Sequence, residues 1–251
     1  MLRNTFLHIP HIGPATEQRL WRGGIRAWDD FAAQAAALRW SAARKDHIHR
    51  WLGESAARLQ QVDSEYFAKL LPAIEHWRAY EEFGDHAAFV DIETNGGTDA
   101  GDITIIGLFD GKQTQTFVQN DNLHKFPDAI AEYPLLVTFN GAQFDLPMLR
   151  RRFPRARLNQ LHIDLRFALR RLGLCGGLKM IEGQLGMMRS EETRGMNGYD
   201  AVILWRQFED RNDRQALRAL VQYNREDVEH LLPLVQMAYQ QLRRITIEAG
   251  C

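Results

Sequence analysis

The chain has 251 residues, a net charge of −1, an apolar fraction of 45% and a charged fraction of 25%, a composition typical of a globular protein with one large domain or two modest ones. The small net charge excludes a global attraction to nucleic acid or acidic membranes, so any such attraction must be local. No apolar run approaches the ~20 residues of a membrane span, and the first residues lack the apolar core of a signal peptide, so we expect a cytoplasmic protein without a membrane partner.

The first third of the chain is helical in character. From about Thr16 to Phe83, apolar residues recur every three or four positions and strand-like runs are absent. The acidic pair at 81–82 then gives way to Gly84. We therefore expect a small all-α domain over residues 1–83 and a second domain over residues 84–251, with the boundary near 82–86.

Residues 9–20, IPHIGPATEQRL, followed by Gly23 and Gly24, resemble a helix-hairpin-helix element. In that motif, glycines let a loop approach the DNA backbone, where loop amides and the next helix N-terminus bind phosphate. Here His11 stands in the place of the first glycine, little chain precedes the hairpin for a first helix, and the usual lysine is missing. Two interpretations stay open: binding of the DNA backbone, and a structural hairpin that docks the helical domain.

After Gly84 the pattern changes to strands. We expect strands in FVDIET (89–94), in ITIIGLFDGKQTQTFVQ (103–119) on both sides of an Asp110-Gly111 turn, and in LLVTFNG (135–141). From Asp145 the pattern returns to helices, the last from Arg214 to Arg244, where Pro233 predicts a kink or a break. Strands with helices on their faces predict an α/β domain with a hairpin-rich sheet.

Charge is uneven in this second domain. Residues 146–190 hold ten basic residues against two acidic ones, a local balance of +8, whereas residues 84–145 hold ten acidic residues against two lysines. An acidic site bordered by a basic segment suits a metal-dependent enzyme that acts on a polyanion. A solvated helix face is the alternative interpretation of the arginines.

Two carboxylates stand inside the first predicted strand. Side chains alternate along a strand, so Asp91 and Glu93 point to one face while Val90 and Ile92 point to the other. Unpaired, the two acids would repel each other, and a divalent cation with a preference for hard oxygen ligands relieves that repulsion. A solvated edge strand is the alternative.

Two further segments carry acids. Asn140 ends a predicted strand and Asp145 opens the next helix, and ligand sites of open α/β sheets collect at strand ends; an N-cap is the alternative role of Asp145. In a later helix, Tyr223 and Asp227 are four residues apart and share a face, with a solvated surface helix as the alternative. Four acids would hold two Mg²⁺ or Mn²⁺ ions ~3.5–4 Å apart, an arrangement used for in-line phosphoryl displacement.

In order, the elements D-x-E, N-x-x-x-F-D and Y-x-x-x-D resemble the three exonuclease motifs of the DEDD superfamily, in its tyrosine subgroup. FNGAQFDLPMLRRRF (139–153) and HIDL (162–165) are similar to proofreading exonuclease domains of family B DNA polymerases. Residues 86–236, including GGLKMIEGQLG (176–186), resemble the YprB-type ribonuclease H-like domain. The resemblance implies a ribonuclease H-like mixed sheet flanked by helices and 3′–5′ hydrolysis of a nucleic-acid strand.

The resemblance also implies residue roles. It assigns Asp91, Glu93 and Asp227 to direct metal contact and Asp145 to the second metal, partly through water, with Tyr223 orienting the attacking water. A phenol of pKa ~10 is a poor general base at neutral pH, which favours this positioning role. Thr94, Asn140 and Phe144 flank the acids and are expected to contact the terminal nucleotide. Lys179 follows the flexible turn at 176–177 and is expected to reach a phosphate.

The alternatives to these substrate contacts are core packing for Phe144 and a solvated surface position for Lys179. For the whole chain, we expect a metal-dependent exonuclease, with DNA slightly favoured over RNA as its substrate. A nucleic-acid-binding module that kept the ribonuclease H-like fold and lost catalysis is one alternative. An endonuclease or transposase of the same broad fold is another.

Overall fold

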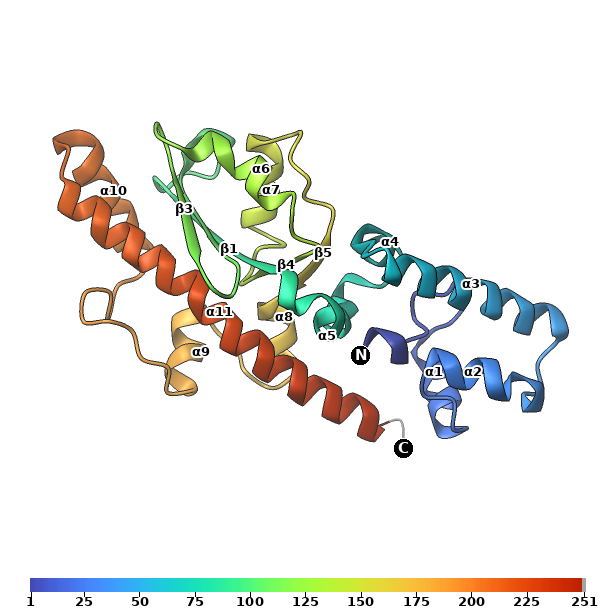
Figure 1. Ribbon diagram of the computed structural model, residues 1–251. Coiled ribbons are helices and arrows are strands. Elements are labelled where there is room, and N and C mark those ends of the chain that lie inside the picture. Colours follow the sequence, from blue (N-terminus) through green and yellow to red (C-terminus); the bar gives the residue numbers. More distant parts are fainter. Residues whose placement is uncertain (250–251) are drawn as a thin grey trace.

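The computed structural model describes residues 1–249 and combines a five-stranded sheet with a predominantly helical remainder (Figure 1). The helices are α1 (Pro14–Arg22), α2 (Trp28–Gln34), α3 (Ala42–Gln60), α4 (Ser64–Leu70), α5 (Tyr80–Phe83), α6 (Phe126–Ile130), α7 (Asp145–Arg152), α8 (Leu165–Arg170), α9 (Leu178–Gln184), α10 (Gly198–Arg211) and α11 (Arg214–Ala249). The strands are β1 (Ala87–Thr94), β2 (Ile103–Phe109), β3 (Thr114–Val118), β4 (Leu135–Thr138) and β5 (Leu161–Asp164).

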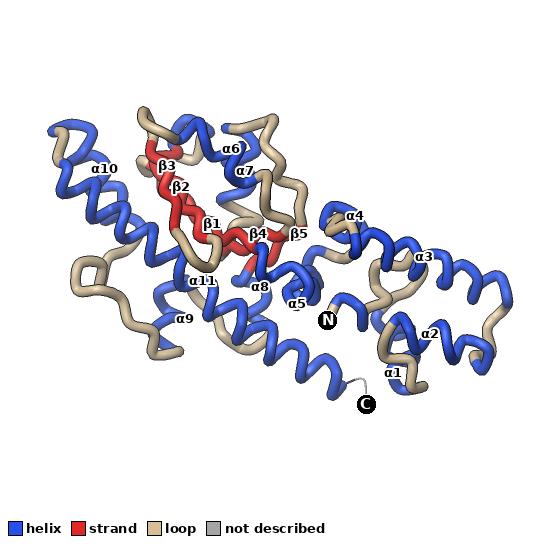
Figure 2. Tube along the Cα trace, viewed as in Figure 1, coloured by secondary structure: helices blue, strands red, loops and turns tan. Residues whose placement is uncertain are grey.

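The sheet is mixed, in the order β3-β2-β1-β4-β5 (Figure 2). Strands β1, β2 and β3 pair antiparallel, whereas β4 and β5 run parallel to β1. The β2–β3 hairpin closes where the Asp110 carboxylate accepts from the amides of Lys112 and Gln113, and Gly111 adopts a φ of 90°. The carboxyl ends of the parallel strands β1, β4 and β5 therefore meet at one edge of the sheet.

Alternation along β1 divides its side chains between two apolar clusters. Ala87 and Phe89 pack into the cluster beneath α8 and α11, while Ala88, Val90 and Ile92 pack against α6 and α7 on the other face. The register places Asp91 and Glu93 on the same side as Phe89, which is the side that α11 covers. Helices on both faces of a mixed sheet confirm the predicted α/β class.

Two local expectations were wrong: a helical region where β5 lies, and a break of the last helix at Pro233 as one of the two alternatives there. The segment of β5 was expected within a helical region, but its four residues continue the parallel ladder beside β4. The last helix is not divided at Pro233 and runs from Arg214 to Ala249. Proline removes only one helical hydrogen bond, and buried Leu231, Leu234 and Val235 hold both sides of that position against the core.

The N-terminal helices share an apolar cluster with the sheet region. Arg78, in a 3₁₀ helix at Ala73–Ala79, is buried and donates to the buried carboxylate of Glu17 at 3.0 Å. The His76 ring bonds to the backbone of His162 in β5. Among the described residues, no helix is long and apolar enough to cross a membrane.

Candidate active site

Three carboxylates from two elements meet at the end of the sheet. Asp91 and Glu93 come from β1 and Asp227 comes from α11, and one oxygen of each lies within 4.8 Å of the others. Glu93 and Asp227 are buried and Asp91 is partly exposed. A helix laid across the strand thus joins acids that are separated by more than a hundred residues of sequence.

Asp145 lies beside this triad and not within it. It opens α7, whose N-cap position is Phe144, so capping is not its role. Its carboxylate accepts from the amide of Ile92 at 3.1 Å, which ties it to the strand between the two β1 acids. It lies near enough to Asp91 for its charge to raise the pKa of that carboxyl.

Burial and mutual repulsion shift the acids strongly. Burial raises the pKa of Asp91 well above its ordinary value, with added repulsion from Asp145 and Asp227. Burial likewise raises the pKa of Glu93 to about 8 and that of Asp145 to about 7. The raised pKa values mean that these carboxyl groups repel one another when ionised. A hard divalent cation such as Mg²⁺ or Mn²⁺ relieves that repulsion.

Two basic side chains contact the triad through Asp227. Lys179 Nζ donates to one oxygen of Asp227 at 2.6 Å, and Arg189 donates to the other. Arg189 also donates two hydrogen bonds to the buried carboxylate of Glu182. The same carboxylate is hydrogen-bonded to Nδ1 of His230 at 3.0 Å. Asp227 is therefore held by cations as well as by its place on α11.

Tyr223 lies one turn before Asp227 on α11, with its ring buried. The Lys179 ammonium is 4.2 Å from the ring centroid. Burial, together with the charges of Asp227, Glu93 and Asp91, raises the pKa of Tyr223 above its ordinary value. The phenol therefore keeps its proton at neutral pH, where it can donate a hydrogen bond and is a poor base.

Asn224 contacts Asp91 and was not identified as a site residue from the sequence pattern. It is fully buried, and its amide nitrogen donates to Asp91 Oδ2 at 3.0 Å. Its side chain lies over Gly107, which pairs with Asp91 in the β1–β2 register. A Cβ at position 107 would lie 2.2 Å from Asn224 Oδ1, so only glycine leaves room for this contact.

Gly107→Ala is therefore expected to push the Asn224 amide off Asp91 and to lower metal affinity about tenfold, the smaller effect typical of a lost outer contact to a metal ligand. Titration with Mn²⁺, followed by thermal stability, measures it. Gly111→Ala is no matched control, because Gly111 needs its positive φ. Gly53→Ala is one, since a Cβ there meets nothing within 4 Å; equal affinities in all three proteins would contradict the prediction.

The other predicted substrate contacts lie around the same edge. Thr94 ends β1, and its hydroxyl accepts from the amide of Gly96 at 3.2 Å. Asn140, with a φ of 65°, follows β4 and accepts from Arg166. Phe144 packs against the α6–α7 cluster, in agreement with the core alternative. Lys179 is not a free surface lysine, because it bonds to Asp227.

Asp164, at the end of β5, organises the loop that precedes Asp145. Its two oxygens accept from the amides of Asn140 at 2.8 Å and Ala142 at 3.0 Å. The HIDL segment contained this residue, but only the parallel pairing of β5 with β4 brings it to the loop. It positions Asn140 and the start of α7 without belonging to the acidic cluster.

The metal-free protein is expected to lose stability as pH rises from 6 to 8. The folded-state pKa values of Glu93 and Asp145 are raised, so the folded state binds more protons than the unfolded state, and each group contributes a slope of up to about 1.4 kcal/mol per pH unit. Divalent metal competes with those protons. A Mn²⁺ concentration of 100 times the Kd at pH 8 should add about 2.7 kcal/mol there. The same concentration should stabilise the protein less at pH 6, as thermal unfolding measures; an equal effect would contradict the assignment.

Comparison with known proteins agrees with this architecture. A structure of the family B DNA polymerase from the hyperthermophilic archaeon Pyrobaculum calidifontis matches with a TM-score of 0.52 and 19% identity, over 65% of this chain and 26% of the polymerase chain. The chain thus spans about a quarter of that polymerase, and the likeness concerns the fold. Among curated proteins, no match is found.

A family model described as the RNase_H superfamily matches residues 88–239. The match starts in β1, includes all five strands and ends within α11. It therefore contains every residue of the acidic cluster and covers more than half of the chain. The protein belongs to the RNase_H superfamily.

Proposed function

We propose that the protein is a metal-dependent 3′–5′ exonuclease that hydrolyses phosphodiester bonds of a nucleic-acid strand by a two-metal-ion mechanism. The observation that carries the proposal is the junction of Asp91, Glu93 and Asp227 at one point, with Tyr223 one turn away. Asp145, tied to Ile92, supplies a fourth carboxylate for the second ion. The order of motifs that resembles the tyrosine subgroup of the DEDD superfamily supports the polarity.

In this proposal the acids bind metal, and neighbouring side chains position the acids and the attacking water. Divalent ions bound by the acids would supply charge for the phosphoryl oxygens and would activate water. Tyr223 keeps its proton and orients that water, because burial and the neighbouring carboxylates disfavour the phenolate. Asn224 fixes the orientation of Asp91, and Lys179 offers a cation next to the developing negative charge.

Strands labelled at the 3′ or the 5′ end test the proposal directly. Single-stranded DNA and RNA are incubated with the protein in Mg²⁺, Mn²⁺ or EDTA, and products are resolved by length. Stepwise, metal-dependent loss from the 3′ end is the expected result, with DNA degraded faster than RNA. Internal cuts would favour an endonuclease, and binding of strands without cleavage would favour the module that kept the fold and lost catalysis.

We also propose that residues 1–83 form a helical domain that assists this activity, joined to an exonuclease domain over residues 84–251. The hairpin before α1 supports a role in binding the DNA backbone, since His11 has the positive φ (67°) that the motif normally gives to glycine. Gly13 is the N-cap of α1, and the positive end of a helix dipole favours a nearby phosphate. Only the three-residue 3₁₀ helix Leu2–Asn4 precedes this hairpin.

A further inference from the structure

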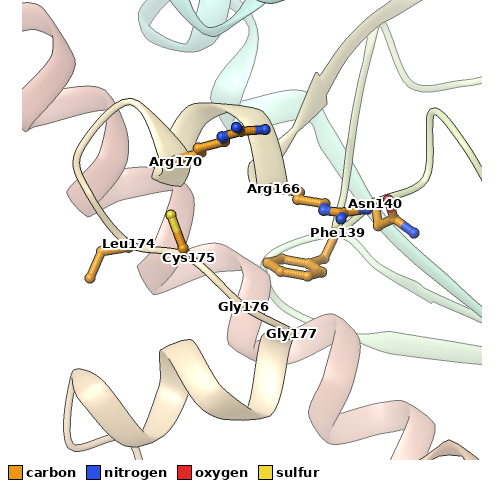
Figure 3. Close-up of a pocket in the computed structure, with 8 residues that line it drawn as sticks. All are labelled: Phe139, Asn140, Arg166, Arg170, Leu174, Cys175, Gly176 and Gly177. Atoms are coloured by element: carbon orange, nitrogen blue, oxygen red, sulfur yellow. Dashed lines mark hydrogen bonds between the residues drawn. The ribbon is translucent and has the colours of Figure 1, made fainter.

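A cavity of about 560 Å³ opens between α8, the loop after β4 and the loop before α9 (Figure 3). One wall contains Phe139 and Asn140, from the segment that leads to Asp145. The opposite wall contains Gly176 and Gly177, directly before the helix that carries Lys179. One wall thus leads to Asp145, beside the acidic cluster, and the other leads to Lys179, which bonds to Asp227 of that cluster.

The cavity is basic. Arg166 and Arg170 both line it, and their spacing of four residues puts them on one face of α8. Arg166 donates to the amide oxygens of Asn140 and Gln143 and forms no ion pair, and Arg170 has no side-chain partner within residues 1–249. The charge of Asp164 lies close enough to Arg166 to interact with it, but no carboxylate of residues 1–249 bonds to either guanidinium, so both can bind an anion.

An aromatic face completes the cavity. Phe139 is partly buried, and Figure 3 shows its ring directed into the space before Gly176 and Gly177. Within the described part of the chain, no other aromatic ring stacks on it. The ring packs in part against the apolar core, and a partly exposed ring beside two guanidinium groups can bind a base and its neighbouring phosphate in a single strand.

We propose that this cavity binds the penultimate nucleotide of a polynucleotide strand, on the 5′ side of the nucleotide that is cleaved. Arg166 and Arg170 bind its backbone phosphate, and Phe139 stacks on its base. The inference rests on the proposed function for the presence of a strand, and it adds a second binding site beyond the acidic cluster. It gives the basic segment of the sequence a definite role in holding the polyanion.

Binding of a short fluorescent single-stranded DNA, and of its RNA counterpart, tests the arginines in EDTA, where no strand is cut. Arg170→Ala should weaken binding about tenfold at low salt. It should also make the slope of log K against log salt less negative by about 0.7, the contribution of one phosphate contact in a single strand. Arg155→Ala, an exposed arginine in the loop that leads into the amino end of β5, whereas α8 follows the carboxyl end of that strand, is the matched control.

Phe139→Leu separates stacking from charge. Leucine keeps the apolar packing, and loss of the ring should weaken binding about tenfold without changing the salt slope. A strand with one neutral methylphosphonate, moved linkage by linkage from the 3′ end, locates the contact. At one linkage near that end, its effect and that of Arg170→Ala should be less than additive.

The outcomes separate the two proposals. If the wild type degrades the strand in Mg²⁺ but Arg170→Ala and Phe139→Leu bind it as tightly as Arg155→Ala does, only the cavity inference is overturned. The same holds if the methylphosphonate effects add at every linkage. If the wild type neither binds nor degrades any strand, the proposed exonuclease function fails, and the cavity inference fails with it.

Discussion

Asp91→Asn is expected to lower strand hydrolysis about 10³-fold, equivalent to about 4 kcal/mol of transition-state stabilisation. The substitution removes one charge from the triad while keeping the shape of the side chain and its bond from Asn224. Binding of divalent metal weakens because a neutral amide oxygen replaces a carboxylate. Release of labelled mononucleotide in Mn²⁺ measures the loss.

The same variant should be more stable than the wild type in EDTA at pH 8. Burial raises the pKa of Asp91 well above its ordinary value, so ionisation of this group destabilises the metal-free fold at high pH. Asp128→Asn, at an exposed acid on α6, is the control and should change neither property. If Asp91→Asn hydrolysed strands at the wild-type rate, the acidic cluster could not be the catalytic site.

Glu17→Gln is expected to destabilise the fold by about 3–5 kcal/mol, the usual cost of removing one member of a buried ion pair. Glu17 accepts from the Thr5 hydroxyl, from the Phe6 amide and from Arg78, all of them buried. The glutamine leaves the Arg78 charge with Glu75 as its remaining ion-pair partner. Urea unfolding measures the loss, with the exposed Glu54→Gln as control.

The shape of that unfolding transition also bears on the proposed domains. If residues 1–83 form a folding unit of their own, Glu17→Gln should melt the helical region first and produce two transitions. If the shared apolar cluster makes the chain one cooperative unit, a single transition should move to lower urea. A loss below 1 kcal/mol would mean that the Arg78 charge finds compensation elsewhere.

The site could be predicted from sequence where local periodicity carried the information. Alternation in FVDIET placed Asp91 and Glu93 on one face, and helical spacing placed Tyr223 and Asp227 together. Both patterns depend only on neighbouring residues. The strand β5 escaped prediction because four residues, LHID, give too short a pattern to distinguish from a helix start.

The supporting contacts could not be predicted, because they join distant parts of the chain. Arg189 meets Asp227 only after the loop beyond α9 folds back on α11, and Asn224 reaches Asp91 only over Gly107. Sequence spacing contains no signal for such pairs. For the same reason, sequence left the role of Phe144 open between core and substrate, whereas the fold places it against α6 and α7.

The position of α11 has a consequence for biosynthesis. The helix begins at Arg214 and brings Tyr223, Asn224 and Asp227 to acids that the ribosome has made more than a hundred residues earlier. A nascent chain that ends before Arg214 contains the strand acids and lacks their helical partner. Because domains of a growing chain fold from the N-terminal side, the acidic cluster is completed only late in synthesis, after α11 has been made.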